Sequence, residues 1–306
     1  MLNNKVSAMQ IGIWIIAAVS GPILYYANGN WFSLLPFAVA LCMLTGIAVC
    51  YGRHWDGPVY HFIQFFWIAV LLSQFLGYSA KCWPTGEQTF PIVPLALLIL
   101  SAISALKGNK NTANGISVVF WLSLLLLGIV FVSGSKNMKF EYIQPNTGEI
   151  STPMILVLFL PAAGGFIKRE RCSILPFIVI AILAIGTSLW IAASLSPEIA
   201  EVMPWSFYEA AKSVELFDVA KRLESLVSVG ITLSNYCLYS LLLCVSASIG
   251  EKYSKRRESI IISVGISVCF MLLGFSIDLI ISSIITLCLW VILPLIGLLK
   301  KKEKEL

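Results

Sequence analysis

The chain has few charged residues. Asp, Glu, Lys and Arg make up 12% of its 306 residues, whereas 58% are hydrophobic and the mean hydropathy is +0.88. Ordinary soluble domains contain about 25% charged residues, and half that share is too small to cover the surface of a soluble protein of this size. This excludes a soluble enzyme, a disordered chain and a nucleic-acid-binding protein. It predicts an all-α integral membrane protein in a lipid bilayer.

Metal ligands and catalytic groups are also scarce. The chain has two histidines, His54 and His61, and none of its eight cysteines forms a C-x-x-C pair. Zinc sites need closely spaced Cys and His ligands, so we predict no metal site and no cofactor. We find no nucleophile beside a base, no phosphate-binding loop and no paired carboxylates. We therefore predict that the protein is not an enzyme.

Long apolar runs are what the sequence does contain. A membrane helix needs about 20 mostly apolar residues, whereas a transmembrane β-barrel shows short alternating segments. Ten runs fit the helical pattern, at residues 7–28, 31–51, 59–80, 90–106, 113–133, 152–167, 173–195, 222–248, 259–275 and 279–299. We expect a single membrane domain over residues 1–306, and ten spans place both termini on the same side.

The distribution of charge predicts which side that is. With ten spans, the side that holds the termini carries 15 basic and 6 acidic residues, a net charge of +9. The opposite side carries 6 basic and 10 acidic residues, a net charge of −4. Lys and Arg are enriched in cytoplasmic loops of membrane proteins. We therefore expect both termini to be cytoplasmic.

Proline and small residues interrupt the first and sixth runs. The interrupting residues are Ser20, Gly21, Pro22, Pro161, Ala162, Ala163, Gly164 and Gly165. Proline removes a backbone donor and glycine lowers helix propensity, so such segments free backbone groups that are costly inside a bilayer unless they bind something. We predict that helices 1 and 6 are interrupted and flank a ligand site. The alternative is that each is an ordinary proline kink.

Each interruption lies in the first span of one half of the chain, and each half contains five spans. We expect a first repeat over residues 1–133, an outer loop over 134–151 and a second repeat over 152–306. Because five is an odd number, the second half has inverted topology. Interrupted helices at corresponding positions of inverted repeats are typical of transporter binding sites.

Polar side chains at helical spacing predict which faces of two spans point inward. One stripe lies in the eighth span and the other in the third, and their members are Ser225, Ser228, Thr232, Asn235, Tyr239, Ser246, Gln64, Trp67, Gln74 and Tyr78. Because Gln and Asn are costly against lipid, we expect both stripes to face the bundle interior. They either line the ligand site or join helices through hydrogen bonds.

Several short segments resemble the B-subunit of spore germinant receptors, a family also described as endospore germination permeases. They are Val6-Ser-Ala-Met-Gln10, Ser20-Gly21, Trp31 at the start of the second span, Ala163-Gly-Gly-Phe-Ile167 and Lys221-Arg-Leu-Glu-Ser-Leu226. The resemblance is spread over most of the chain. It implies the amino acid–polyamine–organocation superfamily and its leucine-transporter-type 5+5 inverted-repeat fold.

The resemblance also implies a role and a site. It implies that the chain binds a small, amino-acid-like germinant beside partner A and C subunits in a spore inner membrane. The pocket that it implies is formed by Ser20, Gly21, Pro22, Gln74, Tyr78, Pro161, Ala162, Ala163, Gly164, Gly165, Thr232 and Asn235. Two other functions remain open from the sequence: a secondary transporter of amino acids or related solutes, and a membrane assembly subunit with a vestigial pocket.

Overall fold

The computed structural model describes residues 6–51, 57–81, 92–135, 138–143, 157–158, 160–161, 175–203, 205–212 and 224–296. Every regular element among these residues is helical. The longer helices are α1 (Ala8–Tyr26), α2 (Trp31–Tyr51), α3 (Pro58–Lys81), α4 (Ile92–Leu106), α5 (Asn109–Gly134), α8 (Leu175–Leu195), α11 (Glu224–Gly250) and α12 (Arg256–Leu272). The shorter ones are the 3-10 turn η2 (Phe140–Tyr142), α9 (Pro197–Val202), α10 (Ser206–Lys212) and α13 (Leu279–Leu287), which continues into the π-helix η3 (Cys288–Ile292).

Nine of the ten predicted spans coincide with described helices to within a few residues. The predicted sixth span, 152–167, lies mostly outside the described residues. Six described helices are long and apolar enough to cross a membrane, and α2 and α4 add shorter apolar stretches. The chain is therefore an integral, multi-pass membrane protein. The total of ten spans stays a prediction.

The predicted interruption of helix 1 is wrong. The helix α1 runs without a break from Ala8 to Tyr26, with Pro22 inside it. Its start is fixed by a capping box, in which the Ser7 hydroxyl accepts from the backbone N–H of Gln10 and the Gln10 side chain accepts from the backbone N–H of Ser7. The helix continues through Pro22, and a hydroxyl of α11 bonds to the backbone of α1 directly before it, as described below. The interruption predicted in helix 6, at Ala162–Gly165, lies outside the described residues.

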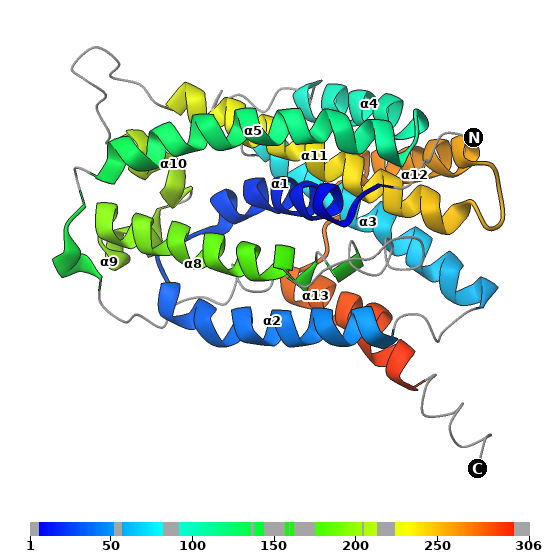
Figure 1. Cartoon of the computed structure of the whole chain (residues 1–306), viewed down its shortest axis with the longest axis horizontal. Helices are drawn as coiled ribbons and strands as arrows, with labels where there is room; N and C mark the ends of the chain where they lie inside the picture. The colour runs from blue at the N-terminus through cyan, green and yellow to red at the C-terminus, as the bar shows by residue number, and fades with distance from the viewer. Residues whose placement is uncertain are drawn as a thin grey trace.

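The helices α1 and α11 form the centre of the bundle. In Figure 1 the helices lie roughly along one long axis, and α1 and α11 run between α5 and α8. The helix α1 packs against α11, α8 and α5, while α11 also packs against α3, α4 and α12. The residues buried in α1 include Trp14, whose indole N–H donates to the Cys237 carbonyl of α11. Groups placed between these two helices are thus shielded from the surroundings of the bundle.

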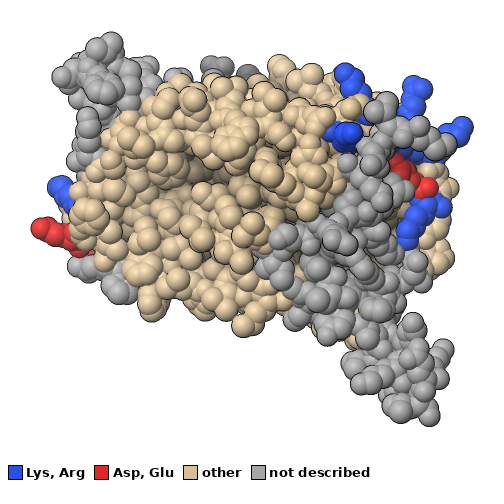
Figure 2. All heavy atoms as spheres, viewed as in Figure 1, with Lys and Arg blue, Asp and Glu red and all other residues tan. Residues whose placement is uncertain are grey.

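Basic residues gather at one end of the bundle. The described Lys and Arg that the charge rule assigns to the cytoplasmic side are Lys107, Lys110, Lys252, Lys255, Arg256 and Arg257. They occupy the α4–α5 and α11–α12 turns, which Arg256 joins through hydrogen bonds to Ala105 and Asn109. On the face drawn in Figure 2, Lys and Arg cluster at the right-hand end, and the middle of the described surface is uncharged. We call this the basic end.

Candidate functional site

One hydroxyl of α11, that of Ser234, is bonded to the backbone of α1. It donates to the carbonyl of Ala17 at 2.5 Å and accepts from the backbone N–H of Gly21 at 2.6 Å. It also lies 2.9 Å from the hydroxyl of Ser20. Because Ala17 and Gly21 are four residues apart, their carbonyl and N–H are a pair that a regular α-helix joins. Ser234 is therefore inserted into the hydrogen-bond ladder of α1.

The local sequence of α1 permits this insertion. Pro22 has no N–H, so the Ala18 carbonyl lacks its usual donor four residues on. Gly21 has no side chain, and a Cβ at this position would lie 2.9 Å from Oγ and 3.0 Å from Cβ of Ser234. A larger residue at position 21 would therefore push the two helices apart. The Gly-Pro pair weakens the ladder at the same place where it lets α11 approach.

The neighbouring residue of α11, Asn235, provides a second polar group on this side of α1. Its side-chain N–H donates to the hydroxyl of Tyr25 at 2.8 Å, and its Oδ1 would lie 3.3 Å from a Cβ at Gly21. The Asn235 side chain is only 4% exposed. Among the described residues no donor bonds to Oδ1. The buried residue Asn235 thus presents an amide oxygen that accepts no hydrogen bond from the described residues, and a bound ligand can donate to it.

Aromatic rings surround this contact. The ring of Trp205, just before α10, lies edge-on to Tyr25 with 6.1 Å between the ring centroids. The ring of Tyr78 in α3 lies edge-on to Tyr26 with a separation of 5.5 Å. Edge-to-face pairs at such distances are attractive and hold the rings in defined orientations. The α1–α11 contact is therefore bordered by rings from α3 and from the α9–α10 connection.

The structure brings part of the predicted pocket together. Ser20, Gly21 and Asn235 meet at the α1–α11 contact, and Tyr78 reaches α1 through Tyr26. Pro22 and Pro161 are both buried. Ala162–Gly165 lies outside the described residues.

Two predicted residues make their polar contacts elsewhere. The Gln74 side chain donates to the Ile277 carbonyl and exchanges hydrogen bonds with the Ser282 hydroxyl of α13. The Thr232 hydroxyl donates to the Ser228 carbonyl of its own helix at 2.7 Å. The polar stripe of α3 thus joins α3 to α13, which is the helix-joining alternative that the sequence left open.

Sequence reasoning missed two residues of the contact, Ser234 and Tyr25. Ser234 precedes Asn235 and lies off the three-and-four spacing that defined the polar stripe. Tyr25 lies one turn after Gly21 in α1. The available signal was position: both residues are within a turn of residues that the sequence had already selected. The partners are 213 and 210 residues apart in the chain, so no local pattern pairs them.

The chemistry of this contact is neutral. Its polar groups are hydroxyls, one amide and backbone groups, and the described residues contain no cluster of three or more His, Cys, Asp or Glu that could hold a metal ion. Such groups recognise a ligand by hydrogen bonds. The arrangement is suited to binding a small polar molecule.

The fold and this contact define a class: a multi-pass membrane protein with the fold of a solute transporter. The chain is similar to the solved structure of MHP1, a nucleobase-cation-symport-1 family transporter in a closed conformation with bromovinylhydantoin bound. The TM-score is 0.52 and the identity 12%, over 94% of this chain and 76% of the transporter. No family model and no curated protein matches the sequence.

Proposed function

We propose that the protein binds a small, amino-acid-like ligand between α1 and α11 and acts as the membrane subunit of a spore germinant receptor. The observation that carries the binding proposal is the Oδ1 atom of the buried residue Asn235, which has no donor among the described residues and lies beside Gly21. The transporter-type fold supports a ligand at this depth, and the resemblance to germinant receptor B-subunits supports the receptor role.

The neutral character of the contact suggests the ligand chemistry. An ammonium or amide N–H would satisfy the Asn235 Oδ1, and the Ser20 hydroxyl, which donates its proton to the Ala17 carbonyl, can accept from a second polar group. Gly21 lets α11 approach this side of α1 closely, which places the Asn235 Oδ1 beside the backbone of α1. In the proposal Tyr78 borders the pocket, and the resemblance adds the segment Pro161–Gly165 to it. A small zwitterion matches this set of groups.

The proposal extends to the arrangement of the chain and its partners. The segments 1–133 and 152–306 would form the two inverted repeats, with α1 and the sixth span at corresponding positions. Both termini would face the cytoplasm, because the basic end carries the Lys and Arg that the positive-inside rule assigns to that side. The receptor would assemble with A and C subunits in the spore inner membrane.

A second candidate is a secondary transporter, and the similarity to a transporter that holds a bound ligand favours it. A transporter must alternate between inward-facing and outward-facing states, whereas a receptor needs only one ligand-dependent change. The Ser234 contact suits either role, because its hydrogen bonds to α1 can be broken and the freed backbone groups of Ala17 and Gly21 can pair with each other.

Ligand binding is tested by thermal unfolding of the purified full chain with a panel of amino acids and hydantoins. A ligand that binds only the folded state raises the unfolding temperature. We expect at least one compound to raise the unfolding temperature of the wild-type chain. Asn235→Leu should abolish this rise, and Thr232→Val, one turn away on α11, should retain it. Loss of the rise in both variants, or in neither, would contradict the site. If no compound stabilises the wild-type chain, the assembly-subunit hypothesis is favoured.

Receptor and transporter are separated by two measurements. Deletion of the gene from a spore-forming host should abolish germination in response to at least one nutrient if the chain is a receptor subunit. Uptake of the same nutrient by reconstituted protein under a proton or sodium gradient would identify a transporter. Normal germination in every nutrient, together with gradient-driven uptake, would replace the receptor by the transporter.

A further inference from the structure

A groove of about 500 Å³ lies at the basic end, between the start of α3 and the α11–α12 connection. Ligand pockets in proteins commonly measure about 300–1,000 Å³. The groove is lined by none of the residues of the α1–α11 contact. Its occupant is therefore a question separate from the ligand proposed above.

The walls of the groove are apolar and open to the outside of the bundle. They include Val59, Phe62 and Phe65 of α3 and Ile262 of α12, and Val59 is 71% exposed. In a membrane-spanning chain, exposed aliphatic and aromatic side chains at this position contact acyl chains. The groove is thus a recess in the surface that faces lipid.

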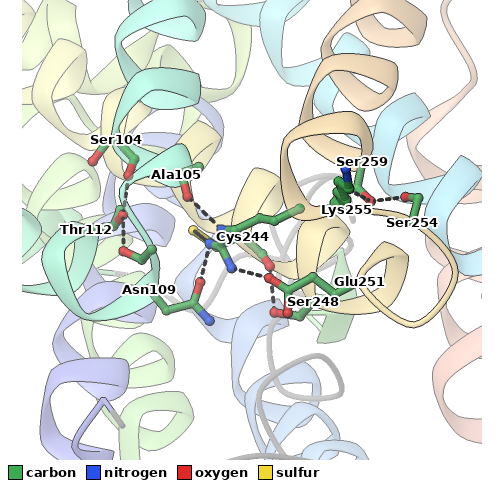
Figure 3. A network of polar contacts seen from close by, with 12 residues as sticks. Ser104, Ala105, Asn109, Thr112, Cys244, Ser248, Glu251, Ser254, Lys255 and Ser259 are labelled. Atoms are coloured by element: carbon green, nitrogen blue, oxygen red, sulfur yellow. Dashed lines mark hydrogen bonds and ion pairs between the residues drawn. The ribbon is translucent and has the colours of Figure 1, made fainter. Parts of the chain in front are cut away.

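The floor of the groove is closed. A Cβ at Gly250 would clash with the Ser259 side chain, so the missing side chain lets α11 and α12 approach closely beneath the groove. The Ser254 and Ser259 hydroxyls lie 2.8 Å apart and bond to each other (Figure 3). The floor therefore offers no unsatisfied donor to an occupant, and specificity has to come from the mouth.

A chain of hydrogen bonds reaches the mouth of the groove. The Lys252 ammonium lies 2.8 Å from Nε2 of His61, and Nδ1 of His61 lies 2.9 Å from the Tyr253 hydroxyl. An ammonium can only donate, so Nε2 accepts, and a neutral imidazole then carries its proton on Nδ1 and donates it to Tyr253. The proton of Tyr253 is left to point away from His61. No acceptor for that proton lies among the described residues, and Tyr253 is 58% exposed.

The surroundings of this mouth are positive. The α11–α12 segment from Glu251 to Glu258 contains four basic and two acidic residues, a net charge of +2, and Lys107 and Lys110 of the α4–α5 turn add to it. Arg256 pairs with Glu251 at 2.7 Å and bonds to Ala105 and Asn109, whose positions Figure 3 labels. The pair neutralises one acid and leaves the cationic residues of both turns in excess. Basic pockets between membrane helices attract anionic lipid headgroups.

We propose that this groove binds one phospholipid with an anionic headgroup. Its acyl chain lies along Phe62, Phe65 and Ile262, and its phosphate accepts from the Tyr253 hydroxyl and pairs with the charge of Lys252. The combination selects the occupant: a free phosphate would leave the apolar walls uncovered, and a neutral lipid would bring no negative charge to the positive mouth. The apolar recess and the donor chain meet at the depth where a lipid changes from acyl chain to headgroup.

The acyl-chain part is tested by filling the groove. Native mass spectrometry of the purified full chain counts bound phosphatidylglycerol, and thermal unfolding measures the stabilisation that the lipid produces. We expect wild-type protein to retain one phosphatidylglycerol, and Val59→Trp to lose it. Val118→Trp is the matched control, because Val118 on α5 is also 71% exposed and does not line the groove. Equal retention in the two variants would overturn the proposal.

The headgroup part is tested by removing the donors. We expect Lys252→Gln with Tyr253→Phe to weaken phosphatidylglycerol binding about tenfold, the effect of losing a charge-assisted hydrogen bond, and to leave phosphatidylcholine binding unchanged. Lys139→Gln with Tyr142→Phe is the control, since this Lys–Tyr pair lies outside the basic end. Equal affinity of wild-type protein for the two lipids would overturn the proposal. So would stabilisation by glycerol phosphate that Val59→Trp does not change, because the source would then be a free phosphate.

Discussion

Two polar regions of α11 differ in the kind of bond that they use. Near the middle of the helix, the neutral Ser234 hydroxyl meets the backbone of α1. Beyond its C-terminal end, Arg256 at the start of α12 donates to the Glu251 carboxylate, the Asn109 amide and the Ala105 carbonyl. Charge is costly at the centre of a bilayer and is tolerated toward its edges. The chain therefore joins its helices through a hydroxyl near the middle of the bundle and through a guanidinium at the basic end.

The difference predicts which region can change. The bonds of Ser234 are replaceable, because Ala17 and Gly21 can pair with each other when Ser234 withdraws. The bonds of Arg256 differ, because one guanidinium joins a carboxylate, an amide and a carbonyl that belong to separate segments of the chain. We infer that the middle contact is suited to ligand-dependent rearrangement and that the basic end holds α4, α5, α11 and α12 in a fixed relation.

Breaking the basic end should produce the largest effect. Arg256→Met removes a cation whose side chain is about one-fifth exposed and breaks its ion pair with the Glu251 carboxylate. We expect a loss of about 3 kcal/mol in the free energy of unfolding, the scale for breaking a largely buried ion pair. Chemical unfolding of the detergent-solubilised full chain, followed by tryptophan fluorescence, measures this loss.

The control for this variant is the next residue. Arg257→Met removes the same charge from an exposed side chain, and we expect a change of at most about 0.5 kcal/mol. A similar loss in both variants would mean that net charge, and not the hydrogen bonds of Arg256, stabilises this end.

Crowding the middle contact should have the next largest effect. Gly21→Leu places side-chain atoms where Ser234 and Asn235 already lie, and overpacking of this kind costs about 2 kcal/mol. Gly186→Leu is the control, because a side chain at Gly186 of α8 would meet nothing within 4 Å. The unfolding assay should show destabilisation at position 21 and none at position 186. The ligand response should be lost at position 21 alone.

The two regions also show what the sequence can and cannot predict. The basic end was predictable, because a count of Lys and Arg between apolar runs requires no knowledge of packing. The limits of nine spans were predictable for the same reason. Residue pairs were not: Gln64 and Gln74 indicate that a face of α3 is inward, but hydropathy does not tell whether the neighbour is α1 or α13, and the Gln74 side chain bonds to α13.

The error in α1 has a physical cause. The low helix propensities of Gly21 and Pro22 predicted a break in the helix. A prediction from propensity takes into account only groups that are near in the sequence. The Ser234 hydroxyl, 213 residues away from Gly21, bonds to the Gly21 N–H and the Ala17 carbonyl, and the helix continues through Pro22. The location of a weak ladder was thus predictable from the sequence. Whether it opens into a break depends on what a distant helix supplies.

Removing the inserted hydroxyl should cost less than crowding it. In Ser234→Ala, the Gly21 N–H and the Ala17 carbonyl can form the ordinary helical bond, so no buried group is left unsatisfied. We expect a loss of about 1 kcal/mol or less in the free energy of unfolding. A loss as large as that of Gly21→Leu would show that the Gly21 N–H and the Ala17 carbonyl cannot pair with each other. Ser234 would then be required as their hydrogen-bond partner.

The smallest change in the free energy of unfolding is expected at Thr232, in the same polar stripe of α11 as Asn235. The Thr232 hydroxyl bonds to the Ser228 carbonyl of its own helix, and valine has nearly the same shape. Because a carbonyl within the helix also accepts from the backbone, we expect Thr232→Val to change the free energy of unfolding by less than about 0.5 kcal/mol. Asn235→Leu, three residues on, removes the bond to Tyr25 and should cost more. If both variants lose the same stability, Thr232 makes a contact in the functional state beyond its own helix, and the pocket extends along α11 as the sequence predicted.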